Sequence, residues 1–90
     1  KTSWYIMKVM MSYTNFLENP QKETFDNLET RLNEVKVRLN VETETVLKIA
    51  EQYKKAKDQE ERTKIRITLN QAMKLLIVFM VENTFSSEES

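Results

Sequence analysis

Glycine, cysteine and histidine are all absent from these 90 residues, and proline occurs only once. Tight β-hairpins depend on glycine because their turns need residues with positive φ, and sandwiches and barrels contain many such turns. Helical bundles need only a few short connections, which Asn, Asp, Ser and Thr can form. The composition therefore predicts an all-α fold, a small antiparallel bundle of three or four helices.

The same absences remove most catalytic chemistry. Histidine is the commonest general base and the commonest transition-metal ligand, and cysteine supplies disulfides and thiolate metal sites. Phosphate-binding loops need glycine. Paired glutamates are typical of solvated helix ends, and we interpret three such pairs in that way: Glu42/Glu44, Glu60/Glu61 and Glu88/Glu89. We expect no enzyme activity and no catalytic, metal or cofactor site.

Charge and hydropathy limit the partners. The 14 basic and 14 acidic residues balance, whereas dedicated polyanion binders are strongly basic. The longest apolar run, Leu75 to Val81, has seven residues, far fewer than the ~20 that span a bilayer. We expect neither nucleic acid nor a membrane as partner. The lack of cysteine favours a cytoplasmic or nuclear location, and a start at Lys1 favours an excised domain.

Two helices are predicted before residue 40. The first runs from Thr2 or Ser3 to about Glu18. Asn19 and Pro20 suit the cap and first position of the second helix. Its apolar residues then follow spacings of 3 and 4, the a/d pattern of bundle packing: Phe25, Leu28, Leu32, Val35 and Leu39.

The segment from Asn40 to Thr43 decides the number of helices. It is poor in strong helix formers, so we favour a break there and a third helix over 42–57; otherwise residues 20–57 form one long helix. Asp58 with Glu61 resembles a capping box, which predicts that the last helix begins near Gln59. We expect that helix to end near Glu82, giving a domain over 1–82 and a flexible acidic tail over 83–90.

The last helix has a predicted core stripe and one alternative. The stripe comprises Ile65, Leu69, Ala72, Met73, Leu76, Phe79 and Met80. The alternation of Ile65, Ile67 and Leu69, followed by the β-branched run 75–81, would also suit a short hairpin. Helix formation is supported by five acid-to-base pairs at i,i+4 spacing, which favour helices: Glu34/Arg38, Glu44/Lys48, Glu51/Lys55, Asp58/Arg62 and Glu60/Lys64.

Two charged segments suggest weaker functions. The basic residues between Lys54 and Arg66 alternate with acids, which is more typical of a solvated helix surface than of a nucleic-acid site. Ser86, Ser87 and Ser90 stand beside Glu88 and Glu89, as in acidophilic kinase substrates. A phosphate there would add charge to a tail that is already acidic.

The functional hypothesis is based on apolar residues that exceed what a single hydrophobic core needs. Exposed apolar patches usually mark interfaces. The residues outside the main stripes that we assign to partner binding are Trp4, Tyr5, Ile67, Ile77, Val78 and Val81. On the first helix, the methionines could face outward instead of Trp4 and Tyr5. The other possibility is that the first and last helices cover each other.

We therefore expect a scaffold or regulatory domain that binds another protein, through an apolar or amphipathic helix, or that associates with itself. Its docking surface would be the apolar faces of the first and last helices. One alternative is nucleic-acid association through the basic residues of the third and fourth helices. Another is a membrane-surface or apolar-ligand role for the first helix.

Overall fold

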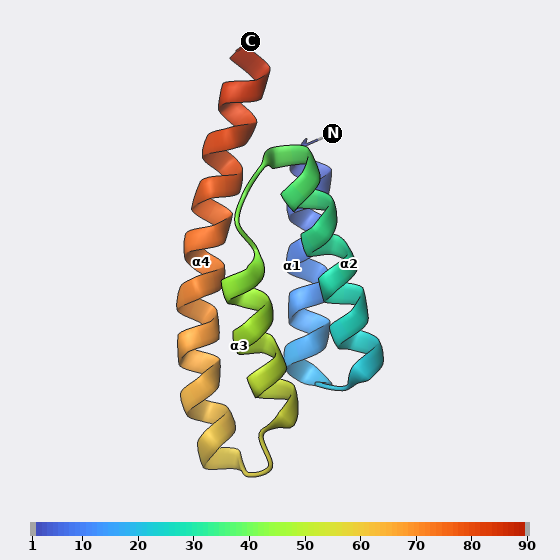
Figure 1. The fold of residues 1–90 in the computed structure, drawn as a ribbon, viewed down its shortest axis with the longest axis vertical. Coiled ribbons are helices and arrows are strands. Elements are labelled where there is room, and N and C mark those ends of the chain that lie inside the picture. Colours follow the sequence, from blue (N-terminus) through green and yellow to red (C-terminus); the bar gives the residue numbers. More distant parts are fainter. Residues whose placement is uncertain (1, 90) are drawn as a thin grey trace.

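The computed structural model contains four helices within residues 2–89, the range over which it describes the backbone: α1 (Thr2–Glu18), α2 (Lys22–Leu39), α3 (Glu44–Lys55) and α4 (Gln59–Glu89). Side chains are described for residues 4–83. Consecutive helices run in opposite directions, and this range contains no strand (Figure 1). The prediction of a four-helix antiparallel bundle is confirmed, and the alternative hairpin over 65–81 is wrong.

The helices form two hairpins, α1 with α2 and α3 with α4, and α3 lies between α4 and the first hairpin (Figure 1). The 31 residues of α4 span about 46 Å at 1.5 Å per residue. That length matches the longest dimension of the molecule, 47 Å. The first helix packs against α2 and α4, and part of its apolar surface stays exposed.

The predicted a/d seam of α2 forms the centre of the core, since all five of its residues are buried. Phe16 of α1 packs between the rings of Phe25 and Tyr53, with centroids 5.9 and 5.7 Å away. The other buried apolar residues that complete the cluster come from α1, α3, α4 and the loop before α3: Val9, Val41, Val46, Ala50, Leu69, Met73, Leu76 and Met80.

Side chains also join the helices through hydrogen bonds. The Tyr53 hydroxyl donates to the carbonyl of Leu17 at 3.3 Å, linking α3 to α1. Asn83 Nδ2 donates to the carbonyl of Leu39 at 2.6 Å. Leu39 is the last residue of α2, where carbonyls lack partners within the helix. The amide of Asn83 therefore ties the C-terminal end of α2 to α4.

Two predicted helix boundaries are confirmed. Asn40 ends α2 in the left-handed conformation, with φ 54° and ψ 48°, which asparagine tolerates better than most residues. This break separates α2 from α3. Asp58 Oδ1 accepts the N–H of Glu61 at 2.7 Å, so Asp58 caps the first turn of α4 as predicted.

The start of α2 is a correction. Asn19 is not the cap, because the helix begins at Lys22 and its N-cap is Gln21. The reason is Thr24, whose hydroxyl donates to the Asn19 carbonyl at 2.6 Å and accepts the Gln21 N–H at 3.2 Å. These bonds close a turn through Pro20, and the helix starts two residues later than predicted.

The end of α4 and one core residue are also corrections. The helix continues to Glu89 rather than ending near Glu82. Phe79 is 47% exposed, because it faces Glu42 and Thr45 in the loop and first turn of α3 instead of a packed helix. The side chains of residues 84–90, including the serines proposed as phosphorylation sites, lie outside the described part of the structure.

Candidate docking surface on α1

One side of α1 carries large apolar residues that the bundle leaves exposed. Met7, Met10 and Met11 are 56%, 48% and 53% exposed, whereas Val9 and Phe16 on the opposite side are almost fully buried. Spacings of 3 and 4 place the methionines on one face of the helix. We call Met7, Met10 and Met11 the methionine face.

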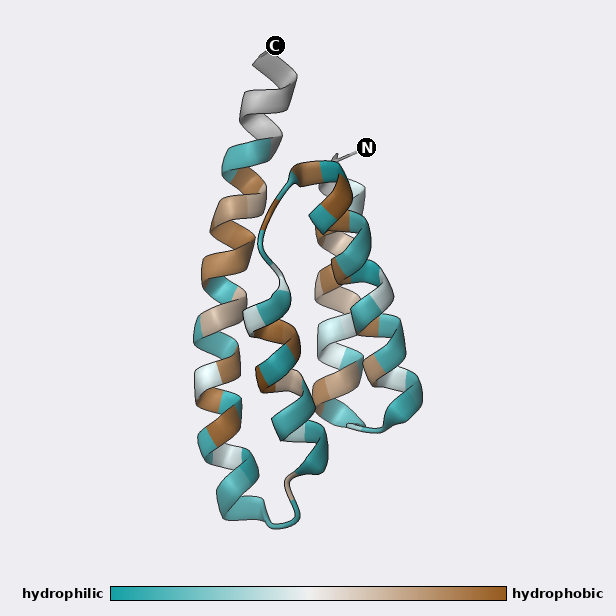
Figure 2. Cartoon of the chain, in the orientation of Figure 1, coloured by the Kyte–Doolittle hydropathy of each residue, from teal (hydrophilic) through white to brown (hydrophobic). Residues whose placement is uncertain are grey.

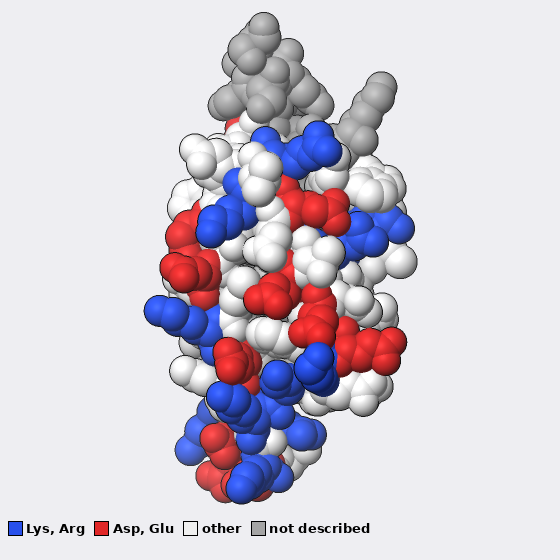
Figure 3. Space-filling view, turned by 45° about the vertical axis from the view of Figure 1, so that its right-hand side comes forward, with Lys and Arg blue, Asp and Glu red and all other residues white. Residues whose placement is uncertain are grey.

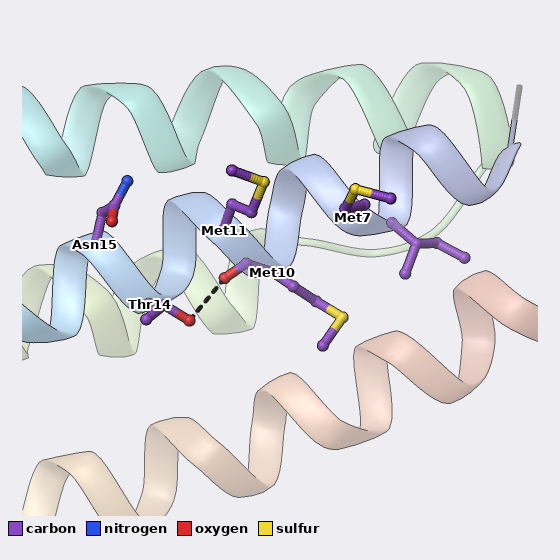
Figure 4. Close-up of a pocket in the computed structure, with 6 residues that line it drawn as sticks. Met7, Met10, Met11, Thr14 and Asn15 are labelled. Carbon is purple, nitrogen blue, oxygen red and sulfur yellow. Dashed lines mark hydrogen bonds between the residues drawn. The ribbon is translucent and has the colours of Figure 1, made fainter.

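Three adjoining hollows run across this side of α1. The first, of about 480 Å³, is lined by the methionine face with Ile6, Thr14 and Asn15. A second, of about 320 Å³, shares Met10 and Thr14 with it and extends to α4. A third, of about 340 Å³, shares Asn15 and extends to α2. In Figure 4, α1 lies between α2 and α4, and Met10 points toward α4.

The charged residues in these hollows are all cationic. The first hollow has none. Arg31 is the charged residue on the α2 side, and Lys74 is the charged residue on the α4 side. Arg31 also forms a 2.9 Å ion pair with Glu34, which neutralises part of its charge. The methionine face is thus an apolar surface with a cation on each flank.

Tyr13 and Asn70 bridge α1 and α4 in the floor of the second hollow, where the Tyr13 hydroxyl donates to Asn70 Oδ1. Burial raises the pKa of the Tyr13 phenol to about 12, although the charge of Arg66 partly opposes this shift. The phenol stays protonated at neutral pH and remains a donor to Asn70, so it joins α1 to α4 beside the second hollow.

The six residues that we assigned to partner binding do not form one surface. Trp4 is 43% exposed, but Lys8 and Arg31 lie within 5.4 and 5.7 Å of its ring centroid. Tyr5 is half-buried beneath Arg38, whose guanidinium lies 5.4 Å from the ring centroid. Both aromatic residues contact arginines of α2, and neither lines the hollows beside α1.

Of the four assigned residues of α4, Ile67 lies apart from the other three. Ile77 is half-buried and lines the second hollow with Met10. Val78 and Val81 are exposed, in the part of α4 that Figure 2 shows as predominantly hydrophobic. Ile67 is exposed about 15 Å further down the helix. Of the six, Ile77 is the residue that lines one of the three hollows beside α1.

Sequence reasoning missed a smaller apolar hollow beside α4. Leu75 and Phe79 are exposed there, next to Glu42, Thr45 and Val46. Hydrogen bonds from Thr45, chiefly from its backbone N–H, lower the pKa of the Glu42 carboxyl. At about 110 Å³ this hollow is much smaller than those beside α1.

The basic residues of α3 and α4 lie among acidic residues. Lys55 pairs with Glu51 at 3.1 Å, and Lys64 pairs with Glu60 at 3.7 Å. Figure 3 shows lysine and arginine interleaved with aspartate and glutamate over the visible lower half of the molecule. These two pairs are among the five expected from i,i+4 spacing, whereas Glu34 pairs with Arg31 instead of Arg38.

The described residues contain neither a candidate metal site nor a candidate membrane-spanning helix. Within this part of the chain, no group of three or more acidic residues is placed to hold a metal ion. None of the described helices has the combination of length and hydropathy needed to cross a membrane.

Comparisons with protein-family models, curated proteins and solved structures found no match for this chain. The functional argument therefore depends on the exposed side chains, hollows and charges described above. Of these, the outward orientation of the methionines was one of the alternatives that the sequence left open. The placement of Arg31 and Lys74 on its two flanks depends on the packing of α2 and α4, which no single-helix pattern reveals.

Proposed function

We propose that this chain is a non-catalytic protein-interaction domain of a scaffold or regulatory protein. It docks an amphipathic helix with acidic flanks across the methionine face of α1. The supporting observation is the continuous series of hollows beside α1, which is apolar at its centre and has Arg31 and Lys74 at its edges. Methionine suits such a site because its flexible side chain adapts to the shape of a partner.

The occupant is a helix because the docking surface offers no partners for the backbone groups of an extended peptide. The residues lining the first hollow extend from Ile6 to Asn15, about 13 Å along α1, or two and a half helical turns. Within residues 2–89 there is no strand edge to which an extended peptide could pair. A docked helix satisfies its own backbone groups and presents apolar side chains at spacings of 3 and 4.

The charges favour acidic flanks and disfavour a second copy of this chain. Glutamates beside the apolar stripe of the partner would lie close to Arg31 and Lys74, and such complementarity fixes register and excludes other partners. Two copies meeting through their methionine faces would instead bring these cations together. Like charges in contact oppose that association.

The proposal can be tested with two synthetic helices of about 18 residues, long enough to be helical alone. Both carry leucines at spacings of 3 and 4. The acidic probe has glutamates on both flanks, and the basic probe has lysines. By fluorescence anisotropy, the acidic probe should bind about tenfold more tightly, because a few partly exposed ion pairs contribute ~1.4 kcal/mol in total.

Three variants locate the binding surface. Met10→Glu should weaken the acidic probe by about tenfold or more, since it places an unpaired charge at the centre of the apolar surface. Ile67→Glu is the matched control, because Ile67 is 56% exposed on α4 and lines none of the three hollows beside α1, so it should not affect binding. Lys74→Glu should reduce the preference for acidic flanks. Equal affinity for both probes, or equal effects of Met10→Glu and Ile67→Glu, would contradict the proposal.

A further inference from the structure

The five methionines of this chain fall into two groups with opposite exposure. Met7, Met10 and Met11 are about half exposed and lie together on α1, whereas Met73 and Met80 are buried at 2% and 0%. The chain has no cysteine. The thioethers of the methionine face are therefore the accessible sulfur atoms, and sulfur is the element in proteins that peroxides oxidise most readily.

Oxidation of a methionine thioether by hydrogen peroxide needs no other group of the protein. The thioether sulfur attacks one oxygen of hydrogen peroxide, the O–O bond breaks, and an S=O bond forms. Sulfur loses two electrons, peroxide is reduced, and water leaves. Methionine sulfoxide reductases reverse the reaction with thiol electrons, so the modification is reversible.

A sulfoxide on the methionine face would be poorly accommodated beneath a docked helix. Its oxygen needs a hydrogen-bond donor once water is displaced. Of the side chains that line the first hollow, the Thr14 hydroxyl already donates to the carbonyl of Met10 at 3.0 Å. The Asn15 amide is the remaining side-chain donor in this hollow, and Lys74, beside Met10 in the second hollow, would pair with the acidic flank of the docked helix. These groups cannot serve three sulfoxides as well.

We propose that Met7, Met10 and Met11 form a reversible oxidation site, and that peroxide releases the partner helix from this domain. The release rests on the proposed function, because it needs the methionine face to be the docking surface. The selectivity of the oxidation depends only on the burial of the five side chains. The two parts can be measured separately.

Selectivity is measured by treating the folded chain with limiting hydrogen peroxide and mapping the products by mass spectrometry. Met7, Met10 and Met11 should gain one oxygen each at least about tenfold faster than Met73 and Met80, whose oxidation requires the core to open. Similar rates at all five positions would show that the methionine face is not a distinct modification site.

Release is measured with the acidic probe. Oxidised protein should bind it about tenfold more weakly or worse, since a buried, unpaired polar group lowers affinity by that order. Treatment with sulfoxide reductases should restore binding. The control is the triple variant Met7→Leu, Met10→Leu and Met11→Leu, which keeps an apolar face without thioethers there. Its own affinity for the acidic probe, measured before and after peroxide, should not change.

The outcomes separate the two proposals. Untreated protein that fails to distinguish the acidic from the basic probe overturns the proposed function, and with it the release. Untreated protein that binds the acidic probe, and binds it equally after selective oxidation, overturns the switch alone. Loss of binding in the oxidised triple leucine variant would assign the effect to residues outside the methionine face and would also overturn the switch.

Discussion

The ionisation of the Tyr13 phenol is coupled to the packing of α1 against α4, because the phenol is partly buried there and bonds to Asn70. Burial raises its pKa from 10.0 to about 12, so the folded state retains the phenolic proton more tightly than the unfolded state. The contribution of this group to stability is therefore fully present below pH 10 and is lost as the pH rises toward 12. Its titration therefore reports the packing around the second hollow, which Tyr13 lines with Met10.

The pKa can be measured in the double variant Tyr5→Phe and Tyr53→Phe, in which Tyr13 is the single remaining tyrosine. Phenolate absorbance should rise with a midpoint near 12, while circular dichroism reports whether the helices persist. The same titration in denaturant provides the reference, with a midpoint near 10. If the folded chain also titrates near the reference value, Tyr13 is not buried against α4 in the described manner.

At the scale of the helices, Asn40 is the residue that separates α2 from α3. Its left-handed backbone costs most L-residues roughly 1–2 kcal/mol. We expect Asn40→Val to lower the free energy of unfolding by about that amount, whereas Asn40→Gly, which has no Cβ, should leave it unchanged or raise it. Urea denaturation measures both variants. A tolerated valine would mean that the chain does not turn at this position.

Helix positions were predictable wherever one helix alone determines them. The 3-4 spacing from Phe25 to Leu39 identified the buried seam of α2, and Asp58 identified the start of α4. The start of α2 was missed because Thr24 bonds back to Asn19 and Gln21, an interaction that competes with asparagine capping. Phe79 was misplaced because a helical wheel does not show where the neighbouring helix gives way to a loop.

At the scale of the whole molecule, the uncovered side of α1 follows from the arrangement of the other helices. They surround the side that carries Val9 and Phe16, and they leave the methionine face exposed. The sequence showed that α1 has more apolar surface than one core needs. It did not show which side stays open, because that depends on where α2 and α4 meet α1 in space.

The docking surface is tested most directly by NMR of protein labelled with ¹³C in the methionine methyl groups. The five methionines then report the docking surface and the core in one spectrum, since three are exposed on α1 and two are buried. Addition of the acidic probe should shift the signals of Met7, Met10 and Met11 most. It should shift the signal of Met73, which lines the second hollow, less, and leave that of Met80 nearly unchanged. Binding that leaves the three α1 signals in place would contradict the account, because the helix would then dock elsewhere on the molecule.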